Sequence, residues 1–105
     1  MNTDISSFLD QNVFHDLHNL NDGFDAHDIK YFSTEEFMKV MDRCEKFGII
    51  LLGIEPWPNG EFEGVKVREE YPHLDASNWH RTAFKEFLKE GVTSHFSASY
   101  AWRKK

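Results

Sequence analysis

The sequence predicts an α+β domain, with a three-stranded, mostly antiparallel sheet and helices packed on one face. Three observations predict this class. Two segments repeat apolar residues at helical spacing between helix start and stop signals. The apolar run at residues 49–52 and an alternating segment near the C-terminus indicate strands, and Asn59-Gly60 is a hairpin signal. We expect residues 1–105 to form a single domain, with the order α-α-β-β-α-β.

Residues 1–28 are an acidic N-terminal segment. They contain six aspartates and neither lysine nor arginine. Apolar residues at roughly helical spacing, among them Phe8, Leu9 and Val13, predict one or two short helices. Asn21-Asp22-Gly23 interrupts that spacing as a turn. We expect this segment to pack on a core formed by residues 29–102.

Residues 34–47 carry the clearest helix signal. Ser33 is a suitable N-cap, and Glu36 completes a capping box. Gly48 follows the last turn, where a glycine is favoured. The face turned to the core is indicated by Phe37, Val40, Met41, Cys44 and Phe47. Because Cys44 is the only cysteine, an intramolecular disulfide is excluded, and its place on this face predicts a small core residue.

The strands follow from the next segments. Residues 49–55 form an apolar run that predicts a buried strand, and residues 56–60 predict a turn. A second strand is expected over about 61–68, with Gly64 marking a bulge, before Tyr71-Pro72 ends it. A third is expected over 93–102. Its alternation sets His95, Ser97 and Ser99 on one side, opposite Phe96, Ala98, Tyr100 and Trp102.

A last helix is expected between the second and third strands. Residues 75–78 offer several capping side chains, and Gly91 ends the helix. Its buried face is predicted to comprise Trp79, Ala83, Phe84, Phe87 and Leu88.

The charge of the chain limits its partners. Twelve basic against eighteen acidic residues give a net charge of -6. Such a chain repels phosphate backbones and anionic membranes, and it attracts a basic partner such as a nuclease. Residues 1–4 show no signal-peptide character, and the longest apolar run is far too short to span a bilayer. We expect a cytoplasmic protein.

The sequence offers no catalytic motif. It has no His-Glu-x-x-His, Gly-x-Ser-x-Gly or phosphate-binding loop. A calcium loop aligned on Gly23 would place Leu20 and Ile29 at ligand positions, so that hypothesis fails. One alternative stays open, a metal-dependent enzyme or enzyme subunit that uses the segment rich in His and Asp: His15, Asp16, His18, Asp22, Asp25, His27 and Asp28. We expect no catalytic residue, metal or cofactor.

A band of aromatic residues lies beside acidic residues on and around the predicted hairpin. Trp and Tyr dominate many protein interfaces, and carboxylates suit the Arg and Lys of a basic partner. The alternatives are that the aromatic side chains close the end of the core, or that they drive self-association in a regulatory module. The predicted partner-binding residues are Asp22, Asp25, Glu55, Trp57, Glu61, Glu63, Glu69 and Tyr71.

About two-thirds of the chain, from Tyr31 onward, resembles a family of bacterial proteins. The residues that carry the resemblance are 31–37, 48–57, 59–62, Trp79, Ala83-Phe84 and 97–100. This pattern is similar to immunity proteins encoded beside polymorphic or contact-dependent growth-inhibition toxins. The resemblance implies a non-enzymatic protein without a cofactor that binds a cognate toxin domain, often a nuclease, and occludes its active site or substrate surface. It implies no particular binding residue.

Overall fold

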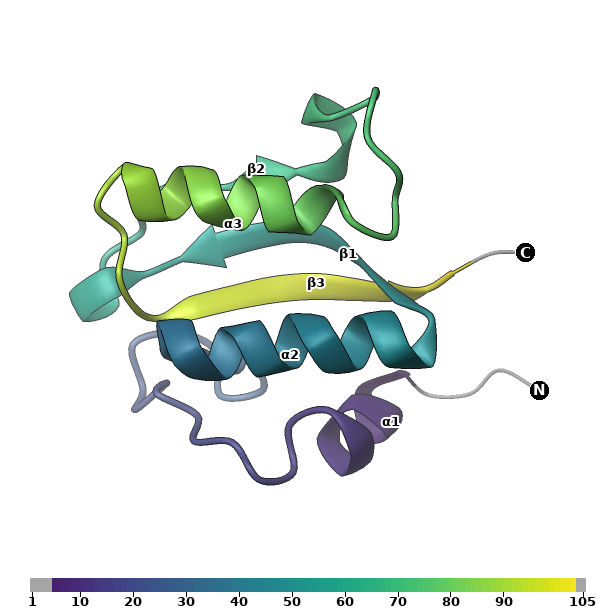
Figure 1. Cartoon of the computed structure of the whole chain (residues 1–105). Helices are drawn as coiled ribbons and strands as arrows, with labels where there is room; N and C mark the ends of the chain where they lie inside the picture. The colour runs from purple at the N-terminus through teal and green to yellow at the C-terminus, as the bar shows by residue number, and fades with distance from the viewer. Residues whose placement is uncertain (1–4, 104–105) are drawn as a thin grey trace.

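The structure, a computed structural model, describes residues 5–103, apart from the side chain of Asn59. The elements are α1 (Ile5–Asn12), α2 (Thr34–Phe47), β1 (Ile49–Pro56), the 3₁₀ turn η1 (Pro58–Gly60), β2 (Lys66–Val67), the 3₁₀ turn η2 (Arg68–Glu70), α3 (Trp79–Lys89) and β3 (Phe96–Trp102) (Figure 1). The predicted fold class and the order α-α-β-β-α-β are therefore confirmed. Residues 1–4, Lys104 and Lys105 lie outside the described part.

The sheet has the order β2-β1-β3, and both pairs are antiparallel. Pairing along β3 runs from Ile49 opposite Trp102 to Pro56 opposite Phe96, with a register shift between Leu51 and Gly53. Such a shift is typical of a β-bulge, which re-aims a side chain. Leu52 stands at that shift and is exposed on the sheet.

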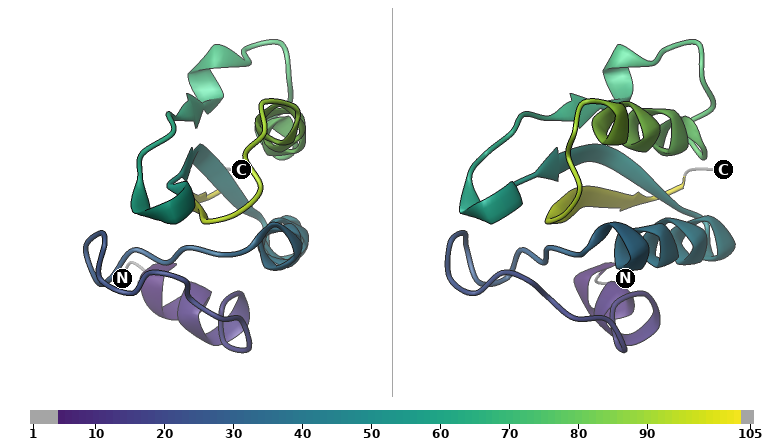
Figure 2. Two further views of the ribbon diagram at one scale, coloured as in Figure 1. Left: turned by 90° about the vertical axis from the view of Figure 1, so that its left-hand side faces the viewer. Right: turned by 60° about the vertical axis from the view of Figure 1, so that its left-hand side comes forward.

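Helices α2 and α3 lie on the same side of the sheet (Figure 2). They enclose a core centred on Phe96, whose ring lies 4.9 Å from that of Phe84 and 5.5 Å from that of Phe37. Trp79 is fully buried, and its indole Nε1 donates to the Leu51 carbonyl at 2.8 Å. The opposite side of the sheet, around Leu52, receives no helix from this pair.

Local signals position α2 as predicted. The Ser33 hydroxyl accepts from the Glu36 amide at 3.2 Å, and Gly48 ends the helix with φ at 72°. The expected capping box is only half formed, because the Glu36 carboxylate accepts from the His18 amide at 2.8 Å and so ties the N-terminal segment to α2. Cys44 is confirmed as a core residue, because it is fully buried and burial raises the pKa of its thiol to about 12.

The N-terminal segment forms one short helix and then an irregular chain. Leu9 and Val13 belong to the core. Arg43 of α2 makes two hydrogen bonds to the Asp16 carboxylate, at 2.6 and 3.1 Å, and a third to the Val13 carbonyl at 2.7 Å. Polar contacts from α2 therefore hold this segment in place together with apolar packing.

Several local expectations differ from the structure. The second strand covers only Lys66–Val67, because residues 61–65 form a loop that follows Gly60 (φ 78°) and contains Gly64 (φ 121°), expected at a bulge within the strand. The third strand begins at Phe96 rather than residue 93, after His95 with φ at 62°. Leu88, expected in the core, is 37% exposed at the rim of α3.

Among residues 5–103, no helix has the length and apolar character needed to cross a membrane.

Candidate functional site

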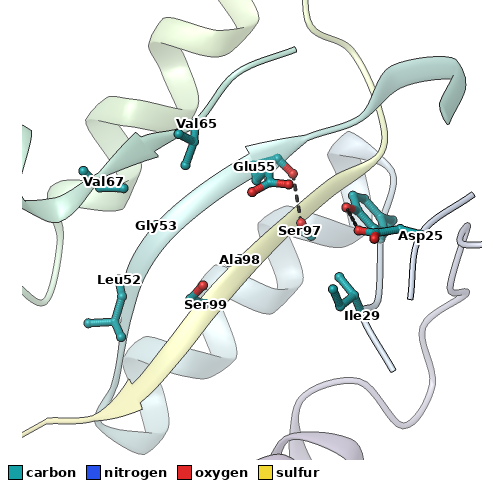
Figure 3. Close-up of a pocket in the computed structure, with 11 residues that line it drawn as sticks. Asp25, Ile29, Leu52, Gly53, Glu55, Val65, Val67, Ser97, Ala98 and Ser99 are labelled. Carbon is teal, nitrogen blue, oxygen red and sulfur yellow. Dashed lines mark hydrogen bonds between the residues drawn. The ribbon is translucent and has the colours of Figure 1, made fainter. Parts of the chain in front are cut away.

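The side of the sheet away from α2 and α3 carries a cavity of about 370 Å³, which we call the sheet-face cavity (Figure 3). Its polar lining is Asp25, Tyr31, Glu55, Ser97 and Ser99, and its apolar walls are Ile29, Leu52, Val65 and Val67. Ile29, Leu52 and Val65 are 38%, 38% and 48% exposed, so the cavity opens to solvent. Its volume falls in the range of natural ligand pockets.

Two carboxylates gather at one end of this cavity. Figure 3 shows Asp25 and Glu55 near Ser97 and away from Leu52. The Tyr31 hydroxyl donates to Asp25 Oδ2 at 2.6 Å, and the Trp57 indole donates to Glu55 Oε2 at 2.5 Å. Because both donors come from ring systems packed on the domain, the two carboxylates are held in fixed positions.

Neither carboxylate has a cationic neighbour within the described residues. The ion pairs of residues 5–103 do not include Asp25 or Glu55, and the cavity lining contains no Lys or Arg. Burial, followed by the hydrogen bond to Asp25, raises the pKa of Tyr31 far above its ordinary value. The phenol therefore stays protonated and keeps its role as donor.

A loop built on two asparagines positions Asp25. Asn19 Oδ1 accepts from the backbone amides of Asn21 and Tyr31, both at 2.9 Å. The Asn21 amide group donates to the carbonyls of Ala26 and Ile29, both at 2.8 Å. These bonds fold the chain between Asn19 and Tyr31 back on itself, so that Asp25 reaches the strands.

Rings of Phe24, Tyr31, Trp57, Phe62 and His95 form an aromatic cluster beside the carboxylates. The centroid of Phe24 lies 4.8 Å from that of Tyr31 and 6.0 Å from that of Trp57. Trp57 in turn lies 5.8 Å from Phe62, which is 55% exposed. The aromatic cluster thus extends from buried Tyr31 to exposed Phe62.

The structure brings together only some of the predicted partner-binding residues. Asp25 and Glu55 line the sheet-face cavity, and Trp57, outside its lining, donates to Glu55. Asp22 is exposed at a neighbouring cavity, which it shares with Phe24, Gly60 and His95. Glu61 and Glu63 are exposed on the loop after η1, and Glu69 is exposed in η2.

Tyr71 lies apart from this group. Its hydroxyl donates to Glu86 of α3 at 2.5 Å, and its ring lies 5.4 Å from that of buried Trp79. It is half-buried where the chain after η2 meets α3. These contacts anchor that chain, while its part in binding a partner stays a prediction.

The other end of the open sheet face is basic. Arg68 and Arg103 line a second cavity there, together with Leu52, Trp102 and Asp75. Arg103 lies 3.8 Å from Asp75. Leu52 borders both cavities, so the face passes from acidic to basic across an apolar centre. Sequence reasoning missed this arrangement, and it also missed Tyr31, Ser97 and Ser99.

The residues of the metal alternative do not converge in the described chain. Among residues 5–103, no three His, Cys, Asp or Glu side chains are grouped so that they could hold a metal ion. Asp16 is engaged by Arg43, and that contact lowers the pKa of its carboxyl group. Asp25 is engaged by Tyr31.

Comparison of the chain with models of protein families, with curated proteins and with solved structures finds no match. The resemblance to immunity proteins therefore stays a prediction from the sequence residues given above.

Proposed function

We propose that this chain is an immunity protein, which binds a cognate bacterial toxin domain in the cytoplasm and neutralises it without a cofactor. One observation carries the proposal. Two carboxylates, Asp25 and Glu55, face an open cavity on an uncovered sheet face, and no cation of the described chain pairs with them. A surface of this kind fits a binding partner that supplies positive charge.

Electrostatic energy favours a partner-binding role for the two carboxylates over a purely structural one. The Tyr31 hydroxyl and the Trp57 indole hold these carboxylates but do not neutralise them, whereas a cation supplied from outside would give charge-assisted hydrogen bonds. Glu61 and Glu63 add exposed negative charge on the loop after η1. The net charge of -6 would also steer a basic protein toward this chain.

A nuclease is the toxin class that suits this surface best. Nucleases hold RNA or DNA through basic surfaces, and an acidic inhibitor competes with the phosphates for the same cations. Exposed Phe62 and Val65, 55% and 48% exposed, supply apolar contact area beside the charges. If the inhibitor occupies those cations, the nuclease can no longer hold its nucleic-acid substrate on that surface.

Co-expression tests this proposal. The product of the adjacent gene is expressed alone and with this chain, and host survival and co-purification are read together. We expect the neighbour to kill when it is alone, and to be neutralised in a stable complex with this chain. A neighbour that is harmless and forms no complex would contradict the proposal.

Self-association is a second candidate, favoured by the same exposed apolar side chains Phe62, Val65 and Leu52. It predicts a hydrodynamic radius that grows with protein concentration. A radius constant from micromolar to millimolar concentration would eliminate it.

A further inference from the structure

We propose that the sheet-face cavity receives one arginine side chain of the partner, with its guanidinium group between Asp25 and Glu55. This inference rests on the proposed function and specifies how the partner is recognised. The occupant is an arginine-bearing segment of a basic protein. Charge complementarity with the uncovered sheet face is the argument for it.

The hydrogen-bonding capacity of the two carboxylates calls for a donor-rich group. A carboxylate offers about four acceptor positions. Within the described residues, Asp25 accepts from the Tyr31 hydroxyl and the Ala26 amide, and Glu55 accepts from the Trp57 indole. Acceptor positions remain on both, and a guanidinium carries five N–H donors and no acceptor.

The walls of the cavity favour arginine over lysine. Leu52, Val65 and Val67 line the cavity from β1 and the β2 side. They suit a stem of methylene groups that leads to a charged head. A guanidinium is more weakly hydrated than an ammonium group and loses less on leaving water, and its planar fork can address two carboxylates at once.

A second copy of this chain is a poorer occupant. Each copy carries a net charge of -6, which opposes the approach of a second copy even though Arg68 and Arg103 lie at the other end of the same face. Like charges opposed across an interface disfavour the complex. A basic partner turns the carboxylates of the cavity into an attraction.

The carboxylates are positioned before the partner arrives. Tyr31 is fully buried, so its hydroxyl holds Asp25 from within the fold, and Trp57 holds Glu55 from the aromatic cluster. Ser97, only 4% exposed, donates to the Glu55 carbonyl at 2.9 Å and fixes the strand beneath. Rigid acceptors reduce the entropy lost on binding.

The test uses Nα-acetyl-arginine amide as a probe, titrated into the full ¹⁵N-labelled chain and followed by NMR. We expect saturable shifts at Gly53, Ser97, Ser99 and the Trp57 indole, with a Kd of about 1 mM for so small a ligand. Nα-acetyl-lysine amide, which has the same charge, should bind at least about 5-fold more weakly.

Two double variants separate the cavity from general charge. D25N/E55Q keeps carbonyl oxygens that accept from Tyr31 and Trp57, and it should lose the saturable shifts. E61Q/E63Q removes the same number of charges from the exposed loop and should keep them. Ser99→Phe fills the cavity without changing any charge and should also abolish binding, and its spectrum reports whether the fold is retained.

Several results would overturn the inference. These are equal binding of the lysine probe, shifts confined to other residues, and unchanged binding by D25N/E55Q. Changes at the same residues with protein concentration alone would assign the cavity to a second copy. If the probe binds as expected but the co-expression test fails, arginine binding in the cavity stands and the immunity function is refuted. If the toxin is neutralised but the arginine probe does not bind, the immunity function stands and the arginine site is refuted.

Discussion

At the residue scale, two aromatic donors keep the carboxylates of the sheet-face cavity in place. Tyr31 is buried and holds Asp25, while Trp57 is half-buried and holds Glu55. Trp57 also packs against Phe24 and Phe62. The Trp57 ring packs in the aromatic cluster, whereas its indole N–H orients Glu55. A single substitution that keeps a ring can therefore test the hydrogen bond alone.

Trp57→Phe should weaken binding of the arginine probe about 5-fold, because it removes one hydrogen bond to a carboxylate and keeps an aromatic ring. Trp102→Phe is the matched control, since Trp102 packs on Phe8 at the basic end of the sheet face. NMR titration measures both. Equal affinity of the Trp57→Phe variant and the unaltered chain would show that the indole does not orient Glu55.

His80 gives the chain a pH-dependent stability. It is fully buried, and its Nε2 lies 2.7 Å from Glu45 Oε2. Burial lowers the pKa of His80 below its ordinary value of 6.5; the nearby Arg81 charge adds to that effect, and Glu45 opposes it. The folded state therefore binds fewer protons than the unfolded state just below pH 6.5, so stability falls as pH falls through this window.

The free energy of unfolding should therefore drop by up to about 1.4 kcal/mol per pH unit below pH 6.5 because of His80. His80→Gln keeps a donor toward Glu45 and should flatten this slope. Urea unfolding between pH 7 and pH 5 measures it. The window lies above the titration of Glu45, because hydrogen bonds from Arg81 and His80 outweigh burial and lower its pKa below 4.5. Parallel slopes for the two proteins would refute the assignment to His80.

The candidate site was only partly predictable from single residues. Acidic and aromatic composition indicated Asp25, Glu55 and Trp57, and they do lie together. Their convergence depends on tertiary contacts, since the loop built by Asn19 and Asn21 carries Asp25 to the strands. Tyr71 shows the converse. The acidic residues before it in the sequence suggested an exposed position, and they did not indicate that its hydroxyl donates to Glu86 or that its ring packs on Trp79.

At the element scale, contacts with α2 fix the N-terminal segment that carries Asp25. Arg43→Ala should lower the free energy of unfolding by about 1–2 kcal/mol, chiefly because the Val13 carbonyl loses its donor. It should also broaden the NMR signals of residues 13–25. Lys39→Ala, an exposed change on the same helix, is the control. A variant as stable as the control, with unchanged signals, would mean that apolar packing alone holds the segment.

Elements with strong local signals were predictable, and those that depend on loop geometry were not. Helix α2 begins and ends where Ser33 and Gly48 indicate, and β1 follows its apolar run. Strand β2 covers only Lys66–Val67, and not the predicted residues 61–68, because the glycine-containing loop before it leaves the sheet. The bulge at Leu52, which shapes the open face, has no distinctive sequence signal, because it arises from pairing with β3.

At the scale of the whole molecule, some carboxylates form ion pairs within the fold and others do not. Asp16, Asp42, Glu45 and Glu90 are paired with cations of the described chain, whereas Asp25 and Glu55 are not. The paired carboxylates hold helices and segments together. The unpaired ones lie on the one side of the sheet that α2 and α3 leave uncovered (Figure 2). Asp25 and Glu55 are therefore available to a partner at the sheet-face cavity, whereas the four paired carboxylates serve contacts within the fold.

The most direct test of this account is the Kd of the complex between this chain and the adjacent gene's product. It is measured for the unaltered chain, D25N/E55Q and E61K/E63K. We predict that D25N/E55Q raises Kd about 100-fold, mainly through faster dissociation, because two charge-assisted hydrogen bonds are lost. E61K/E63K should slow association and reduce its salt dependence. A complex whose Kd is unchanged by D25N/E55Q would contradict the central claim that the sheet-face cavity recognises the partner.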